Sequence, residues 1–220
     1  VMAMFSGADL SCIRGEREVF RHLDFGLDAG GMLVLTGPNG SGKSTLLRLM
    51  AGLLSAEQGA MTWNGVATSD DPEAHNARLH YVGHLDAIKP ALDVTENLLF
   101  WASMHGGNAD AASRVSNALT ALDIGFLSDT PAQYLSAGQR RRVALARILA
   151  SPARIWLLDE PTTALDKHAM ATLEQIIADH RAAGGMVVVS THTAIAGDGQ
   201  AVLDLAPFAA HAQMPTGEAA

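Results

Sequence analysis

Short apolar runs alternate along this chain with longer stretches in which apolar residues recur at helical spacing. Residues 8–27 alternate apolar and polar positions around Arg14-Gly15-Glu16, which predicts two half-buried strands joined by a turn. The run at 60–63, followed by Asn64-Gly65, predicts a strand and a tight turn. Further runs have the length and composition of buried strands; they lie at 32–36, 79–82, 155–158, 186–190 and 201–205.

The helical spacing predicts five helices. The first, residues 43–54, is expected to stop near Gly52, and the last, residues 167–183, precedes Gly184-Gly185, a typical helix end. The other three are expected at 94–104, 111–122 and 137–149. The alternation of strands and helices predicts an α/β fold with a mainly parallel sheet covered by helices.

Composition and charge narrow the classes of protein. With 48% hydrophobic and 17% charged residues, the chain is expected to fold rather than stay disordered. A net charge of −8 argues against nucleic acid as a bulk partner. The single cysteine, Cys12, excludes an intrachain disulfide and a cysteine-only metal cluster, and fits a reducing cytoplasm. No membrane-spanning run and no secretory signal are visible, so we expect a membrane role only through a partner.

Residues 37–45 carry the candidate phosphate-binding loop. Gly37-Pro38-Asn39-Gly40-Ser41-Gly42-Lys43-Ser44-Thr45 matches G-x-x-x-x-G-K-[ST] at every fixed position. Its glycines bring backbone N–H groups close to phosphate oxygens, Lys43 offers a charge to the β- and γ-phosphates, and Ser44 offers a hydroxyl to Mg²⁺. The alternative is a glycine-rich turn, but a chance match is expected in only about 1% of chains of this size. The loop therefore predicts binding of a nucleoside triphosphate.

Two carboxylates, Asp159 and Glu160, follow the apolar run at 155–158. Ligands of open α/β sheets sit at the carboxyl ends of the strands. We therefore expect Asp159 to help hold Mg²⁺ and Glu160 to polarise the attacking water as general base. The alternative is a solvated acidic turn after a strand.

A second candidate phosphate-binding segment begins at Ser136, before the helix at 137–149. Ser136 can cap this helix, and its hydroxyl and the N–H groups of Gly138 and Gln139 can bind a γ-phosphate. A capped basic helix, followed by Arg140-Arg141-Arg142, is the structural alternative. One phosphate-loop domain does not need two such segments, but a pair of chains does if each copy reads the nucleotide of the other.

Together these motifs resemble the nucleotide-binding domain of an ABC transporter over residues 10–205. Ala137 stands where the family signature usually has glycine. The motifs that carry the resemblance are the Walker A loop at 37–44, the Walker B strand at 155–159, the signature at 135–139, the D-loop at 164–166 and the switch histidine at His192.

The resemblance implies a P-loop NTPase fold in which an antiparallel β-subdomain and a helical insert join the parallel sheet. It implies one domain over residues 1–220, divided into a catalytic core at 1–84 and 151–205, a helical subdomain at 85–150 and a tail at 206–220.

The resemblance also implies that two copies of the chain close head to tail around two ATP molecules. Lys43, Glu160 and His192 of one copy would then be catalytic, and Ser136 and Gly138 of the other copy would complete the site.

Two positions depart from the family pattern. Where the family has a glutamine after the strand at 79–82, this chain has His84 or Leu85, depending on a one-residue choice of alignment. His84 could accept a hydrogen bond from a water, whereas Leu85 could not ligate a metal. Where the family has an aromatic ring on adenine, Arg14 stands, and its guanidinium plane can stack on a base.

Finer features resemble the ATPase subunits of cytochrome c biogenesis haem exporters. They lie in residues 81–101, 139–147 and 155–166. This resemblance implies a complex with transmembrane subunits of the CcmB, CcmC and CcmD type, on the cytoplasmic face of a bacterial inner membrane. ATP hydrolysis there would move haem or release a haem-loaded chaperone. Residues 83–101, with Pro90 and Leu92 as contacts, would receive the membrane partner, and no direct haem site is evident in the sequence.

Two alternatives stay open. The first is an ABC exporter ATPase for another substrate, such as a drug or a lipid. The second is a soluble ABC-type ATPase that acts on DNA or ribosomes; the chain shows no second ATPase half, no long coiled-coil insert and no basic surface in its favour.

Overall fold

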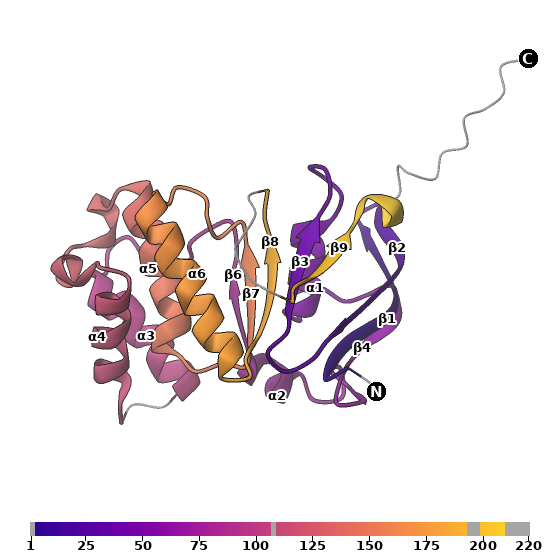
Figure 1. The fold of residues 1–220 in the computed structure, drawn as a ribbon, viewed down its shortest axis with the longest axis horizontal. Coiled ribbons are helices and arrows are strands. Elements are labelled where there is room, and N and C mark those ends of the chain that lie inside the picture. Colours follow the sequence, from indigo (N-terminus) through magenta and orange to yellow (C-terminus); the bar gives the residue numbers. More distant parts are fainter. Residues whose placement is uncertain (1–2, 107–108, 193–198, 210–220) are drawn as a thin grey trace, which may run out of the picture.

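The computed structural model describes residues 3–106, 109–192 and 199–209 as two sheets and a group of helices (Figure 1). The parallel sheet has the strand order β6-β7-β8-β3-β9. Its strands are β3 (Met32–Thr36), β6 (Leu79–Val82), β7 (Ile155–Asp159), β8 (Met186–Ser190) and β9 (Ala201–Asp204). The antiparallel sheet has the order β2-β1-β4-β5. Its strands are β1 (Phe5–Arg14), β2 (Arg17–Leu27), β4 (Gln58–Trp63) and β5 (Val66–Ala67).

The helices cover the parallel sheet from both sides. They are α1 (Lys43–Met50), α2 (Pro72–Ala77), α3 (Val94–Gly106), α4 (Ala111–Ala121), α5 (Ala137–Ala150) and α6 (Lys167–Ala182), with short 3-10 helices η1 (Gly125–Leu127), η2 (Ala132–Tyr134) and η3 (Ala206–Phe208). Figure 1 shows α3, α4, α5 and α6 on one side of the parallel sheet, and α1 with the antiparallel sheet on the other. The predicted α/β fold with a parallel sheet is thus confirmed.

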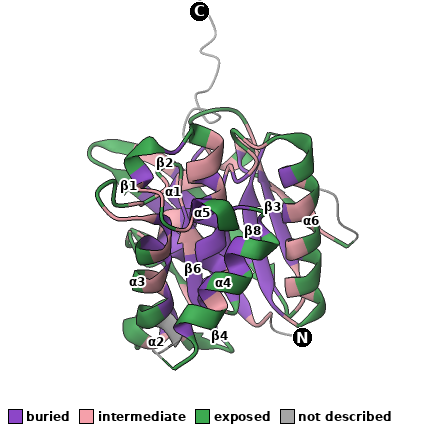
Figure 2. Cartoon of the chain, turned by 90° about the vertical axis from the view of Figure 1, so that its left-hand side faces the viewer, coloured by how far each residue is buried: buried purple, intermediate pink, exposed green. Residues whose placement is uncertain are grey.

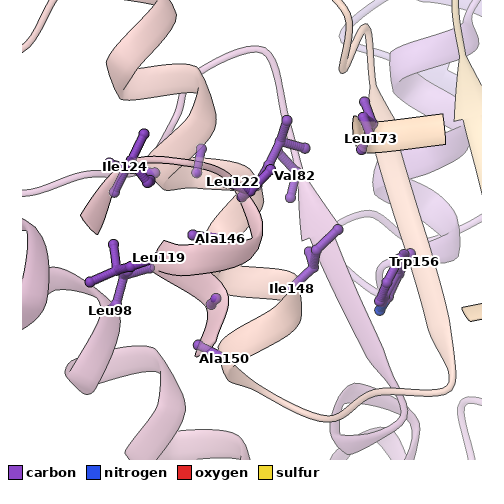
Figure 3. Close-up of a cluster of buried hydrophobic side chains, with 14 of the residues drawn as sticks. Val82, Leu98, Leu119, Leu122, Ile124, Ala146, Ile148, Ala150, Trp156 and Leu173 are labelled. Carbon is purple, nitrogen blue, oxygen red and sulfur yellow. The ribbon is translucent and has the colours of Figure 1, made fainter. Parts of the chain in front are cut away.

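The three inner strands of the parallel sheet, β7, β8 and β3, are mainly apolar because both of their faces are buried, whereas the edge strand β9 is largely exposed. Along β7, Ile155 and Leu157 join a core shared with α1 and the antiparallel sheet. The alternate residues, Trp156 and Leu158, join the core beneath the helices. Figure 2 shows the buried strands behind helices whose outer faces are exposed. In Figure 3, Leu98 of α3, Leu119 of α4 and Ile148 of α5 belong with Trp156 to the helical core. This two-sided burial fixes the carboxyl ends of the strands, where the candidate site lies.

Helices α3, α4 and α5 pack on one another within the stretch predicted as a helical subdomain. Their buried residues belong to the same core as β7 and β8, so packing is continuous from the helices to the sheet. The proposed division of the chain at residues 85 and 150 therefore stays a prediction. Among the described residues, none of the helices combines the length and the apolar character that crossing a membrane requires.

Two segments differ from the sequence-based expectation. No helix was predicted between the strands at 60–63 and 79–82, but α2 forms there, because the Asp71 carboxylate accepts a hydrogen bond of 2.9 Å from Ala74 N and Pro72 starts the helix. The tail expected from Ala206 onward is ordered at its start as η3, and Ala209 forms a bridge with Phe20 of β2. Residues 210–220 of the predicted tail lie outside the described residues, as do Gly107 and Asn108.

Helix α1 ends at Met50, earlier than the predicted residue 54. The N–H of Gly52 donates to Leu49 O at 3.0 Å, and the N–H of Leu53 donates to Arg48 O at 2.9 Å. This pair of bonds is the Schellman motif that closes a helix before a glycine.

Candidate active site

The predicted phosphate loop connects the end of β3 to the start of α1. Gly42 precedes the helix with a φ of 103°, and a Cβ at this position would lie 2.8 Å from Val19 Cγ1. Only glycine fits here, because both the backbone conformation and the close approach of β2 exclude a side chain. No side chain caps the start of α1. The first N–H groups of the helix therefore point at the loop, where an anion is the favoured ligand.

Lys43 lies over this loop and is buried, with 8% of its surface exposed. Its Nζ donates hydrogen bonds to Gly37 O at 2.8 Å and to Pro38 O at 3.2 Å. Within the part of the chain that the structure describes, no carboxylate pairs with this buried ammonium group, which makes it a strong site for an anion such as phosphate.

The two oxygens of the Asp159 carboxylate differ in their hydrogen bonding. Ser44 Oγ donates to its Oδ1 at 3.0 Å, and Ser190 Oγ donates to the same oxygen at 2.7 Å. Its Oδ2 is buried and has no hydrogen-bond partner among the described residues. Burial raises the pKa of the nearby Tyr81 phenol, and the negative charge of Asp159 raises it further against the opposing effect of Arg48. Asp159 is thus a buried carboxylate with a lone oxygen that suits a cation.

Glu160 leaves the end of β7 with a backbone φ of 48°, in the left-handed region. Its N–H donates to Ser190 O at 3.0 Å and to Ser190 Oγ at 3.1 Å. Its Oε1 lies 3.3 Å from Nε2 of His192. The two residues that the sequence places at the ends of separate strands therefore meet in space.

These side chains surround a cleft of about 800 Å³. Among the predicted site residues, its lining includes Arg14, Asn39, Gly40, Gly42, Lys43, Ser44, Thr45, Glu160 and His192. Gly37, Pro38 and Ser41 belong to the loop but not to the lining, and Asp159 is buried beneath Ser44. His84 lines the cleft, whereas Leu85 is 83% exposed and outside it. Of the two residues left open by alignment, the structure brings His84 to the site.

The second candidate phosphate-binding segment, which begins at Ser136, lies outside this cleft. Ser136 Oγ accepts a hydrogen bond of 3.2 Å from Gln139 N, and Gln139 Oε1 accepts one of 2.8 Å from Ser136 N. This capping box is the structural alternative considered from the sequence. Gly138 packs against the D-loop segment, where a Cβ would lie 2.9 Å from Ala164 O. Within one copy of the chain, the structure does not bring Ser136, Gly138 or Gln139 to the cleft.

Two residues of the site were not singled out from the sequence. Ser190 ends β8, and its hydroxyl joins Asp159 to Glu160 because β7 and β8 are neighbours in the sheet. Arg141 of α5 is buried and donates to the backbone of both carboxylate residues. Ser190 could have been found from its place at a strand end, but nothing in Arg140-Arg141-Arg142 indicates which arginine turns inward.

Comparison with known proteins places this geometry in a family context. A model of the ABC transporter family matches residues 20–163. The cytochrome c biogenesis ATP-binding export protein CcmA of Paramagnetospirillum magneticum is 55% identical over 212 residues, which are 96% of this chain and 98% of that protein. The protein of the same name from Rhodospirillum rubrum is 56% identical over 207 residues, which are 94% of this chain and 88% of that protein.

Solved structures show the same fold. An ATP-binding subunit of an ABC transporter superposes with a TM-score of 0.78 at 26% identity, covering 86% of this chain and 80% of that one. A putative ABC transporter ATP-binding protein from Pyrococcus furiosus reaches a TM-score of 0.80 over 93% of this chain and 98% of its own. At 23% identity the second likeness shows the fold alone.

Proposed function

The chain belongs to the ABC transporter family of ATP-binding proteins, and from this premise we propose that it is the ATP-hydrolysing subunit of a membrane complex for cytochrome c biogenesis. The observation that carries this function is the identity of 55% and 56%, over nearly the whole chain, to two export proteins named for that process. We further propose that hydrolysis drives haem export, or the release of a haem-loaded chaperone.

The triphosphate of ATP would lie along the loop at 37–45. Lys43, already buried over this loop, would exchange its bonds to carbonyl oxygens for bonds to β- and γ-phosphate oxygens. The N–H groups at the start of α1 would bind the same phosphates. The adenine ring of ATP would lie at the β1–β2 turn, where Arg14 lines the cleft and offers a flat guanidinium group for stacking.

The oxygen donors at Ser44 and Asp159 fit Mg²⁺. This ion prefers hard oxygen ligands, and the buried Oδ2 of Asp159 has no protein donor to satisfy it among the described residues. Ser44 Oγ would face the ion directly, and Asp159 would face it directly or through water. When bound, Mg²⁺ supplies positive charge that offsets the charge developing on the phosphates.

Glu160 is the proposed general base. Its carboxylate would accept a proton from a water molecule while the water oxygen attacks the γ-phosphorus, and the bond from that phosphorus to the bridging oxygen would break. His192, 3.3 Å from Glu160 Oε1, would orient the carboxylate and contact the γ-phosphate. Removing Glu160 should therefore stop turnover without removing the groups that bind ATP.

A second copy of the chain would complete each site. Ser136, Gly138 and Gln139 lie at the start of a basic helix outside the cleft of their own chain, so they are available to the nucleotide held by a partner copy. The proposed arrangement is a head-to-tail pair with two ATP molecules between the copies.

Membrane subunits of the CcmB, CcmC and CcmD type are the proposed further partners, and the chain would sit at the cytoplasmic face of the inner membrane. The receiving surface is proposed at residues 83–101. Within these residues Leu85 is 83% exposed, Phe100 is 43% exposed, and Pro90 is exposed as well. Solvent-exposed apolar side chains of this kind are suited to pack against a helix of a partner protein.

Deleting the gene and assaying covalent c-type cytochromes tests this function. We expect these cytochromes to be lost and to return with the wild-type gene but not with a Lys43→Ala copy. Normal cytochrome levels, with the chain still in the membrane fraction, would point to another exported substrate. A chain found only in the supernatant of cells that make its neighbours would point to a soluble ATPase instead.

A further inference from the structure

The guanidinium group of Arg141 joins α5 to two separate segments beside the candidate active site, residues 83–86 and 159–161. Only 4% of this residue is exposed. A guanidinium group has five N–H donors in a planar fork, and this one makes five hydrogen bonds. Nε donates to Pro161 O at 3.3 Å; Nη1 donates to Gly83 O at 2.9 Å and Asp86 Oδ1 at 3.1 Å; and Nη2 donates to Asp159 O at 2.7 Å and Glu160 O at 2.8 Å.

Two of these bonds hold the backbone at Glu160, through the carbonyl oxygens of Asp159 and Glu160. The Glu160 N–H is bound by Ser190, and its carbonyl oxygen is bound by Arg141. Glu160 has a φ of 48°, which a residue with a Cβ adopts reluctantly. With both of its peptide groups tied, the residue keeps this conformation, and its carboxylate stays beside His192.

Two other bonds attach the same guanidinium group to the loop after β6. Gly83 and Asp86 flank His84, which lines the cleft, and Leu85, which is exposed on the proposed membrane-partner surface. A shift of this loop would change the bonds of Arg141, and through them the backbone of Glu160. The Arg141 side chain therefore binds both the loop at residues 83–86 and the backbone that carries the Glu160 carboxylate.

The geometry points to Arg141 as a positioning residue for ATP hydrolysis: it holds Glu160 in its active conformation and links it to the loop at residues 83–86. This inference rests on the proposed role of Glu160 as general base. Arg141 lies behind the nucleotide cleft and is not one of the residues that line it.

The packing of α5 does not depend on Arg141 alone, which makes the inference testable. Further along the helix, Arg147 Nη2 donates to Tyr81 O of β6 at 2.6 Å, and its guanidinium group lies 4.5 Å from the ring centre of Trp101. Burial lowers the pKa of Arg147 to about 10, which leaves it charged at neutral pH. We therefore expect Arg147 to keep α5 attached to the sheet when Arg141 is replaced.

Arg114 offers a matched control. It also donates to backbone carbonyls, from Nε to Ala150 O at 2.9 Å and from Nη2 to Ala102 O at 2.9 Å, but both acceptors belong to the helices and not to the cleft. A glutamine at either position removes a charged fork from carbonyl acceptors. Only the change at Arg141 should reach the reacting groups.

The test compares Arg141→Gln, Arg141→Lys and Arg114→Gln in the full chain, purified with the membrane partners that accompany it. For Arg141→Gln we expect kcat to fall about tenfold or more, with KM for ATP changed by less than about threefold. Arg141→Lys should recover only part of kcat, because an ammonium group cannot reach all these acceptors. Arg114→Gln should lower Tm and leave kcat unchanged. Should Arg141→Gln not fold, Arg141→Lys provides the same comparison.

A double-mutant cycle with Glu160→Gln separates the inference from the function on which it rests. If Arg141 acts through Glu160, its replacement should cause no further loss of the residual kcat of Glu160→Gln, measured in an excess of protein where that rate stands above uncatalysed hydrolysis. An unchanged kcat in Arg141→Gln, with a lowered Tm like that of Arg114→Gln, would overturn the positioning role and leave Glu160 as base. Full hydrolysis by Glu160→Gln alone would overturn the proposed base and the inference together.

Discussion

The indole ring of Trp156 and the imidazole ring of His180 lie face to face, with centroids 3.6 Å apart and an angle of 6° between their planes. Trp156 is a buried residue of β7, and His180 belongs to the last turn of α6. Burial lowers the pKa of His180 below its ordinary 6.5. The stack thus joins helix to sheet through a ring that is neutral in the folded protein at neutral pH.

This stack predicts a loss of stability in mild acid. An imidazole with a lowered folded-state pKa stabilises the fold fully above its unfolded pKa of about 6.5, and this contribution is lost as the pH falls through the lowered value. Burial also lowers the pKa of His75, which adds to the effect. We expect the free energy of unfolding, measured in urea from about pH 7.5 down to about pH 5, to fall by up to about 1.4 kcal/mol per pH unit for each histidine. His180→Phe keeps a stacked ring, so the free energy of unfolding should depend less steeply on pH, with only the contribution of His75 left. An unchanged slope would show that His180 does not cause the loss of stability in acid.

Gly185→Ala should destabilise the protein by displacing the same ring. A Cβ at residue 185 would lie 2.2 Å from Cε1 and Nε2 of His180. We expect a loss of about 1–3 kcal/mol in urea unfolding, as for other overpacked sites. Gly125→Ala is the control, because a Cβ at Gly125 meets nothing within 4 Å. In a His180→Ala background the cost of Gly185→Ala should largely vanish, and a cost that persists would show that His180 is not its cause.

Lys43→Ala should weaken nucleotide binding without weakening the fold. Its Nζ bonds only loop carbonyls within the described chain, so its removal takes a positive charge from the phosphates and little from the core. We expect the Kd for a fluorescent ATP analogue to rise about tenfold or more, with Tm unchanged. Lys167→Ala, at an exposed lysine outside the cleft lining, should keep the wild-type Kd. Equal affinities for both variants would rule out the phosphate role of Lys43.

His84→Ala should lower kcat, whereas Leu85→Ala should not. The two residues are adjacent, but only His84 lines the cleft, where its ring could hold a water near the γ-phosphate. Steady-state ATP hydrolysis by the chain without its membrane partners measures both changes, so the proposed contact of Leu85 with those partners does not enter the comparison. If His84→Ala hydrolyses ATP normally, the site has no γ-phosphate sensor at this position and His192 must suffice.

Elements with a simple burial pattern could be predicted closely from the sequence. Strand β7 (Ile155–Asp159) was expected to within one residue, because its first four residues are buried on both faces and form a continuous apolar run. The loop at 37–45 was located because its glycines and Lys43 occur at a spacing that few other structures require. In both cases the physical cause acts within a short stretch of chain.

Features that depend on contacts between distant segments could not be predicted. Three arginines follow one another after Gln139, and only the folded structure shows that Arg141 turns toward five acceptors from other segments. Ser190 acquires its role because β8 pairs with β7, and the strand order was not deduced from the chain. Helix α2 was missed because six residues are too few for a helical period to show.

The left-handed backbone of Glu160 has one more consequence. Glycine adopts a φ of 48° without hindrance, so Glu160→Gly should raise the free energy of unfolding by up to about 1 kcal/mol while removing the carboxylate. Thermostability and activity therefore conflict at this position. A laboratory selection for heat resistance alone would be expected to enrich glycine at residue 160, and the more thermostable variant would be a poor ATPase.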